Sequence, residues 1–284
     1  MTKTRKPSGD GSPVPALTRG LDILRLFKRT RPVIAAPDIA RELAIPRSTV
    51  HRLTRVLESM GFLQRTNGDR DYTLGPAVLT IGFEYLGSLD VVDLAEPLLT
   101  RLRDETGYSA HLVTRNGTEI VYLSRYPGHA TISSSIAVGA TLPAHATVIG
   151  RALLADLPPD ELRALYAGHP MTSYTDQTPT TIAKLEALLA EDRRRGYVAA
   201  TSFFEPGLTT VAAPVRDRSG RVTAAISVTA LGIPIPTGVV HGELKDKVCA
   251  TANAISAMLD APETARRGRA PGAALVRRGE AQHV

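Results

Sequence analysis

Cationic and hydroxyl side chains gather on one face of a helix that the sequence predicts between residues 46 and 60. Helical spacing gives the other face an apolar stripe of Val50, Leu53, Leu57 and Met60. The polar face carries Arg47, Ser48, His51, Arg52 and Arg55. Guanidinium, hydroxyl and imidazole groups bond to phosphates and base edges, so this face is typical of a helix that enters the major groove of DNA. For this helix taken alone, a merely solvated charged face is the alternative.

The flanking elements favour DNA binding. Residues 37–43 predict a short helix, followed by a tight turn at Ala44-Ile45 and by Pro46 at the first position of the next helix. Gly61 is a helix stop, and short strands at 62–65 and 72–74 flank the hairpin signal Asn67-Gly68. We therefore predict a winged helix-turn-helix. Its candidate DNA contacts are Arg47, Ser48, Thr49, His51, Arg52 and Arg55 on the helix and Arg65 and Arg70 on the wing.

Charge is unevenly distributed along the 284 residues. The formal net charge is +6; residues 14–75 hold eleven cations and six acids, whereas residues 76–260 hold fifteen cations and nineteen acids. This asymmetry suits one nucleic-acid-binding domain beside a domain with another task. There is no apolar run of 18 residues and no secretory signal, and the one cysteine, Cys249, excludes an intrachain disulfide. We expect a cytoplasmic protein without a membrane span.

The helix predicted at 76–88 is apolar on nearly every side. Only Thr80 and Glu84 interrupt its apolar sequence, and such a helix must be buried on more than one side. We expect it to join two domains and to form part of a homodimer interface. Burial against the chain's own second domain is the alternative.

Residues 89–260 alternate helical and strand patterns, and hairpin signals such as Asn116-Gly117 predict an antiparallel α+β sheet. Strands are expected at 109–114, 119–125, 132–138, 197–202, 208–215 and 222–229, and helices at 91–106, 147–155, 159–166, 180–195 and 239–260. Residues 1–14 and 261–284 are expected to be disordered tails, the second one basic. No G-x-S-x-G elbow, P-loop, H-E-x-x-H or zinc-ligand spacing is present, so we expect no enzyme activity, no cofactor and no metal.

Several segments resemble the IclR family of bacterial transcription regulators. The matching stretches are Leu17–Phe27, Asp38–Leu63 and Asp71–Gly82 in the first half, and Val138–Ala155 and Gly207–Val228 in the second. Two blocks in the right order, over about residues 15–260, are more specific than a lone helix-turn-helix. Gly82–Leu102 resembles the aromatic-acid-responsive branch of the family.

The resemblance implies a domain order and partners. A winged helix-turn-helix would span 15–75, a linker and dimerisation helix 76–88, and a GAF-like effector-binding domain with an antiparallel sheet 89–260. The implied partners are double-stranded DNA with a palindromic operator, a small organic acid, and further copies of the chain in a homodimer or a dimer of dimers. The implied effector-binding residues are Leu142, Val148, Ile149, Thr201, Phe203, Thr210, Ser227 and Thr229.

General chemistry agrees with such a pocket. Backbone N–H groups at the helix start after Thr147 would attract a carboxylate, and the hydroxyls at 227 and 229 share one face of a strand. Phe203 and Phe204 would cap an aromatic ligand, ordinary packing being the alternative. His145 is expected to be structural.

Three functions remain open from the sequence. The first is a ligand-responsive transcription factor of a catabolic operon. The second is an enzyme acting on a small organic acid with an accessory basic domain, against which the missing catalytic motifs count. The third is an effector-independent DNA-binding oligomer, which a filled sheet face would favour.

Overall fold

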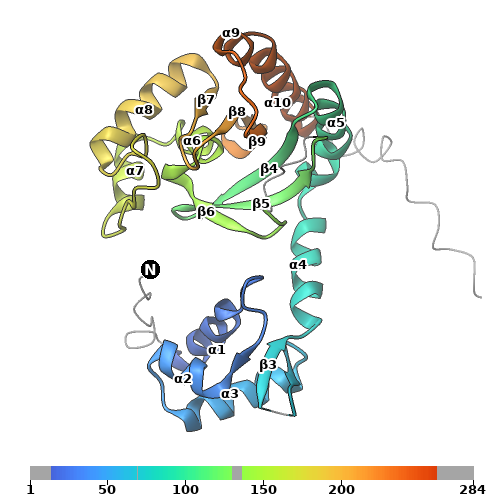
Figure 1. Ribbon diagram of the computed structural model, residues 1–284, viewed down its shortest axis with the longest axis vertical. Coiled ribbons are helices and arrows are strands. Elements are labelled where there is room, and N and C mark those ends of the chain that lie inside the picture. Colours follow the sequence, from blue (N-terminus) through green and yellow to red (C-terminus); the bar gives the residue numbers. More distant parts are fainter. Residues whose placement is uncertain (1–13, 69, 130–135, 261–284) are drawn as a thin grey trace, which may run out of the picture. The chain divides into compact units, whose positions relative to one another are not determined.

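The computed structural model describes residues 14–68, 70–129 and 136–260 (Figure 1). The expected disordered tails therefore lie outside the described residues, except for Val14, which precedes the first helix. The chain divides into two compact units, one ending at Ser88 and the other beginning at Leu89. No helix among the described residues is both long and apolar enough to cross a membrane.

The first unit is helical and is completed by a three-stranded antiparallel sheet of order β1-β3-β2. Its elements are α1 (Pro15–Leu26), β1 (Ile34–Ala35), α2 (Ala36–Leu43), α3 (Arg47–Ser59), β2 (Leu63–Thr66), β3 (Asp71–Leu74) and α4 (Ala77–Gly87). Its core includes Ile23, Ile39, Val50, Leu63 and Tyr72. Burying each of these large side chains contributes roughly 1.5–3 kcal/mol, so the core fixes α3 against the strands.

The turn between α2 and α3 is tight, as the sequence predicts. Ala44 adopts a left-handed φ of 52°, and the Ile45 N–H donates to the Ala40 carbonyl at 3.1 Å. Pro46 precedes the helix instead of opening it, because its ψ of 143° is extended. This places the first helical position at Arg47.

The buried stripe of α3 differs from the predicted one at its end. Met60 is 59% exposed, whereas Thr54 is fully buried. Val50, Thr54 and Leu57 follow one another by four and three residues and form the inward row. Met60 lies beyond the last helical residue, Ser59, so helical spacing no longer applies to it.

The second unit is built on a six-stranded antiparallel sheet of order β6-β5-β4-β9-β8-β7, which confirms the predicted α+β class. Its strands are β4 (Ser109–Asn116), β5 (Glu119–Tyr126), β6 (Thr141–Pro143), β7 (Val198–Thr201), β8 (Leu208–Arg216) and β9 (Val222–Leu231). Its helices are α5 (Asp90–Thr106), the 3-10 turn η1 (Ala144–Ala146), α6 (Val148–Leu154), α7 (Pro159–Tyr166), α8 (Ile182–Arg195), α9 (Thr237–Val239), the π-helical turn η2 (Val240–Leu244) and α10 (Lys245–Asp260).

Alternation along the strands separates the two faces of this sheet. α5 and α10 pack together against β4 and β8, and α6 packs on β8 and β9 (Figure 1). The core on the α6 side includes Ala212 and Ala225, whereas the odd-numbered residues of β8 point the other way. The α6 face is the one that contains the cavity described below.

The prediction of a strand at 132–138 is wrong for residues 136–138, which are the part of this segment that the structure describes. Residues 132–135 lie outside the described residues, and Ile136, Ala137 and Val138 are not in a strand. The edge strand β6 comes later, at Thr141–Pro143. Gly139 has a left-handed φ of 81°, and this turn redirects the chain before it pairs with β5.

Candidate functional site

The outer face of α3 presents unpaired cations. Arg47, Ser48, His51, Arg52 and Arg55 are all exposed, and Thr49 is half-buried beside them. None of the salt bridges among the described residues involves Arg47, Arg52 or Arg55. Three guanidiniums on one helical face, with no carboxylate drawing them inward, can pair with phosphates or with guanine edges.

The wing is fastened to this helix by two side-chain contacts. The Thr54 hydroxyl donates to the Val50 carbonyl at 3.0 Å and lies 3.2 Å from the Tyr72 hydroxyl on β3. Arg65 on β2 donates from Nε to Glu58 at 2.9 Å, with its guanidinium over the Tyr72 ring. Arg65 is therefore engaged within its own unit, whereas Arg70 is exposed at the turn.

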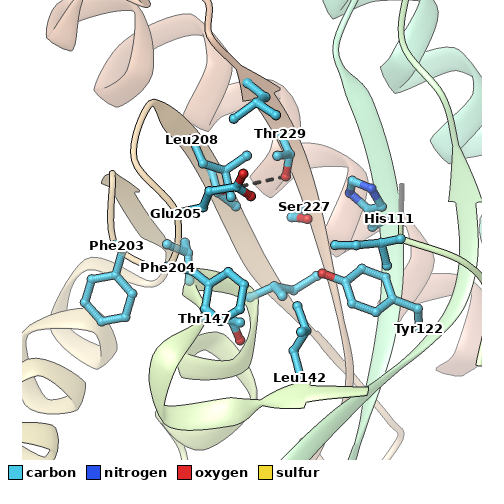
Figure 2. Close-up of a pocket in the computed structure, with 15 residues that line it drawn as sticks. His111, Tyr122, Leu142, Thr147, Phe203, Phe204, Glu205, Leu208, Ser227 and Thr229 are labelled. Atoms are coloured by element: carbon cyan, nitrogen blue, oxygen red, sulfur yellow. Dashed lines mark hydrogen bonds between the residues drawn. The ribbon is translucent and has the colours of Figure 1, made fainter. Parts of the chain in front are cut away.

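The second unit contains a cavity of about 340 Å³ on the α6 face of the sheet (Figure 2). Small-ligand sites usually have volumes of about 300–1,000 Å³ and mixed linings of this kind. Its lining is made of His111, Tyr122, Ile136, Leu142, Thr147, Val148, Ile149, Phe203, Phe204, Glu205, Leu208, Thr210, Ser227, Thr229 and Leu231. The lining thus combines hydroxyl groups, one imidazole and one carboxylate with apolar and aromatic walls, and it includes no lysine or arginine.

Hydroxyl groups on β8 and β9 form the polar floor of the cavity. Thr210 and Thr229 are paired across the strands, with their hydroxyl oxygens 3.3 Å apart. Ser227, two residues before Thr229, points to the same face. These hydroxyl groups can donate hydrogen bonds to the oxygen atoms of a ligand.

The helix α6, which forms one wall of the cavity, is capped at its N-terminus by a threonine side chain. Thr147 precedes the helix, and its hydroxyl accepts from the Gly150 N–H at 3.1 Å. The N–H groups of the first helical turn have no partner within a helix, so those of Val148 and Ile149 are the remaining donors at this end.

Phe203 is held next to α6 in the wall of the cavity. Arg151 and Asp192, both buried, form a bidentate pair at 2.6 and 2.8 Å, and the Arg151 guanidinium lies 4.7 Å from the Phe203 ring centroid. The Phe203 carbonyl also accepts from the Thr175 and Thr178 hydroxyls. This network fixes one wall of the cavity before any ligand arrives.

His111 and Tyr122 form a buried aromatic corner. Their ring centroids lie 5.6 Å apart in an edge-to-face arrangement. Burial, and then the charge of Arg125, lowers the pKa of His111 to about 3. Burial alone raises the pKa of Tyr122 to about 12. Both groups are therefore neutral at physiological pH, and each can offer a ligand a hydrogen bond without a charge.

The structure brings together seven of the eight residues predicted for the effector site. Leu142, Val148, Ile149, Phe203, Thr210, Ser227 and Thr229 line the cavity, and Thr201 does not. Thr201 pairs with Thr209, and their hydroxyl oxygens lie 2.9 Å apart. Ala200 pairs with Thr210, so Ala200 has the orientation that was predicted for Thr201. Because strand side chains alternate, an error of one residue reverses the face.

His145 lies outside the lining, as expected for a structural histidine. Its Nε2 lies 3.1 Å from the Thr172 carbonyl, and its ring packs edge-to-face on Tyr166. Burial lowers its pKa, with the Thr172 bond acting in the opposite direction.

Sequence reasoning missed three polar lining residues, His111, Tyr122 and Glu205. His111 and Val113 are two residues apart on β4 and therefore point to the same face of the sheet, but the sequence pattern does not tell whether this face is the one with the cavity. Glu205 lies in the loop between β7 and β8, where no periodicity applies. His111 is placed opposite Ser227 by the pairing of β4 with β9, which the sequence alone does not reveal.

Family models and known proteins match both units. Residues 16–67 match the IclR helix-turn-helix domain, and residues 83–257 match the family described as bacterial transcriptional regulator IclR C-terminal. The chain is 34% identical to the HTH-type transcriptional regulator XynR of Escherichia coli over 221 residues, which cover 77% of this chain and 86% of that protein. It is 32% identical to the Pca regulon regulatory protein of Pseudomonas putida over 223 residues, covering 78% and 76%.

A solved structure gives the same result. The crystal structure of an IclR homologue from Microbacterium hydrocarbonoxydans complexed with 4-hydroxybenzoate aligns with a TM-score of 0.74 and 27% identity, covering 87% of this chain and all of that one. Two matched domains, in the order that the sequence predicts, leave one conclusion. The chain belongs to the IclR family of bacterial transcriptional regulators, with a helix-turn-helix DNA-binding domain and a C-terminal effector domain.

Proposed function

We propose that this chain binds a palindromic operator as a homodimer through α3, and that a small organic acid in the cavity of the second unit controls this binding. The observation that carries the proposal is the row of exposed, unpaired guanidiniums on α3. We assign Arg47, Ser48, Thr49, His51, Arg52 and Arg55 to the major groove and Arg70 to the neighbouring backbone. Arg65 is assigned a supporting role, because Glu58 already holds it.

The DNA-binding assignment is tested by truncating α3. A duplex selected from a random library by the wild-type chain serves as the ligand in an anisotropy titration. Arg52→Ala and Arg47→Ala are each expected to raise the Kd about 5- to 150-fold, since a specific contact contributes roughly 1–3 kcal/mol. Arg194→Ala, which breaks an exposed pair with Glu191 on α8, is the control. Unchanged affinity for both α3 variants would remove α3 from recognition.

The effector assignment rests on the cavity and on two relatives. An open cavity on the sheet face favours ligand binding over an effector-independent oligomer. The structural neighbour holds 4-hydroxybenzoate, and one relative is named for the Pca regulon. These names support a small aromatic acid and the regulation of a catabolic operon.

Substitutions on the cavity floor test the effector assignment. Ser227→Ala and Thr210→Val each remove one hydroxyl with little change in volume. A hydrogen bond to a charged group contributes roughly 1.5–3 kcal/mol, so each variant is expected to weaken acid-induced release or recruitment of DNA by tenfold or more. DNA binding without an effector should not change. A wild-type response in both variants would place the ligand elsewhere.

The homodimer assignment rests on α4. Leu79, Ile81, Phe83 and Tyr85 are between 51% and 61% exposed, and none of the residues of α4 is buried. Soluble proteins rarely leave such a contiguous apolar surface open. A second copy of the same helix is its natural cover, and it would also supply the second recognition helix that a palindrome requires.

A further inference from the structure

Two buried nitrogen atoms have no partner, one in the cavity lining and one on the strand next to it. His111 Nε2 and Arg125 Nε are inaccessible to solvent and accept or donate no hydrogen bond among the described residues. Buried polar groups are nearly always satisfied, and each exception calls for an explanation such as an absent ligand. His111 lines the cavity directly.

Strand register brings these groups together with Ser227. His111 on β4 pairs with Arg125 on β5 and with Ser227 on β9. Directly paired residues in an antiparallel sheet have their Cβ atoms about 4.5–5.5 Å apart and point to the same face. Imidazole, guanidinium and hydroxyl therefore form one row across three strands, and Figure 2 shows His111 and Ser227 in the same part of the lining.

The charge in this row is uncompensated. Arg125 takes part in no salt bridge among the described residues, and its field is strong enough to oppose protonation of His111. Arg125 is half-buried and its Nε is inaccessible to solvent, so a negative group beside this unpaired cation is favoured. Elsewhere in the lining, the carboxylate of Glu205 repels an acid, and Thr147 already occupies one N–H group of α6.

We propose that the carboxylate of the ligand binds at the β4/β5/β9 row, accepting from His111 Nε2–H and the Ser227 hydroxyl in the field of Arg125. The start of α6 then faces the remainder of the ligand. This inference rests on the proposed function, because it requires that an acid occupies the cavity. His111 is the specificity-determining residue, and Arg125 adds selectivity for charge.

The test compares acids with their amides on the full-length chain. Benzoate, 4-hydroxybenzoate and pyruvate are titrated by calorimetry beside benzamide, 4-hydroxybenzamide and pyruvamide. The wild-type chain is expected to bind at least one acid ten times more tightly than its amide. His111→Leu should raise the Kd of that acid at least tenfold. His111→Gln, whose amide can replace Nε2–H, should restore part of the loss.

Arg125 is tested by the ratio of the two affinities. Arg125→Met should weaken the acid at least fivefold and leave the amide within a factor of two, because only the charged ligand senses the guanidinium. Arg101→Gln changes an exposed arginine on α5 and is the control for net charge. Circular dichroism identifies folded variants, and His111→Gln and Arg125→Met carry the test if His111→Leu does not fold.

The outcomes separate the two proposals. If acids bind and the His111 and Arg125 variants bind them like the wild type, the carboxylate lies elsewhere and the present inference fails while the proposed function stands. An equal loss of acid and amide in Arg125→Met also overturns the assigned role of its charge. If no acid binds the wild-type chain, the acid-sensing function fails, and this inference fails with it.

Discussion

At His111 the protein keeps an imidazole neutral where water would leave it half protonated near pH 6.5. Burial is the larger cause, and the charge of Arg125 is the second. Since a neutral imidazole carries one proton on one of its two nitrogens, it can donate to one ligand oxygen without bringing a charge into the cavity. Recognition by such a residue depends on geometry more than on ionic attraction.

This lowered pKa predicts a pH-dependent stability. The folded pKa of about 3 lies below the ordinary value of 6.5, so between these values the unfolded chain binds a proton that the folded chain does not. The free energy of unfolding that comes from keeping His111 neutral is fully present above pH 6.5, and it is lost as the pH falls toward 3. At pH 5 the wild-type chain should have lost about 2 kcal/mol relative to His111→Leu.

Chemical denaturation followed by circular dichroism at pH 7.5 and pH 5 measures this difference. Taking the difference between the two chains cancels the titration of all other groups. His51→Gln, at an exposed position of α3, is the matched control and should lose as much stability as the wild type. Parallel losses in wild type and His111→Leu would mean that the buried imidazole is protonated in the folded chain.

Whether a single residue could be assigned to the cavity from the sequence depended on knowing which face of the sheet its side chain points to. Ser227 and Thr229 were assigned correctly to one face because they are two apart on one strand. Thr201 was placed on the wrong face, since nothing in the isolated sequence sets the register between β7 and β8. The partner of His111 across the sheet is set by the same long-range pairing.

Elements of the first unit depend on a close backbone approach between two glycines. Gly61 ends α3 with a φ of 75°, and a Cβ on Gly75 would lie 2.1 Å from the Gly61 carbonyl oxygen. The Gly75 N–H donates to the Phe62 carbonyl, which closes the hairpin that follows α3. The position of the wing therefore requires glycine at residue 75, because any side chain there would collide with the Gly61 carbonyl.

Gly75→Ala should destabilise the first unit by roughly 1–3 kcal/mol, the usual cost of forcing extra volume into a packed site. The loss of thermal stability would be accompanied by weaker DNA binding. Gly87→Ala, where a Cβ meets nothing within 4 Å, is the control and should be neutral or stabilising in a helix. Equal melting temperatures for the two variants would contradict the steric argument.

The apolar surface of α4 gives a second prediction at this scale. Leu79→Glu combined with Leu86→Glu should convert dimers to monomers or aggregates, because the carboxylates would be buried at the proposed interface. Sedimentation velocity at micromolar concentration measures the change, and Thr80→Glu is a single-charge control on the same helix. A wild-type chain that sediments as a monomer would contradict the dimer.

The main helices and strands were more predictable from the sequence than the edge strand of the sheet and the exact ends of the helices. The amphipathic pattern located α3, and hairpin signals at Asn67-Gly68 and Asn116-Gly117 located two pairs of strands, with Gly117 at a φ of 61°. The edge strand β6 has only three residues, too few for alternation to be recognised. The capping position of Pro46 was also missed, because proline is over-represented at the first helical position, which is where the sequence therefore placed it.

For the whole molecule, the uneven charge determines how DNA binding responds to salt. The described first unit holds the exposed guanidiniums of α3, and the acidic excess lies in residues 76–260. Each phosphate contact releases counterions and contributes about −0.9 to the slope of log K against log salt concentration.

The salt slope distinguishes phosphate contacts from base contacts. Arg70→Gln, on the wing turn, should reduce the steepness of the slope by about one and weaken all sequences alike. Arg52→Gln should instead lower the preference of the chain for its selected duplex over a scrambled one. Anisotropy titrations between 50 and 300 mM salt supply both quantities. A salt slope unchanged by Arg70→Gln would exclude a phosphate contact at the wing.

Ala200, Ala212 and Ala225 lie on the cavity face of three adjacent strands, and this has an evolutionary consequence. They pack in the same core as the lining residues Val148, Ile149 and Phe203, although they do not line the cavity themselves. Most substitutions of an alanine add volume, and extra volume in a packed core displaces its neighbours. Substitutions that accumulate at these positions are therefore expected to narrow the proposed effector site more often than to widen it.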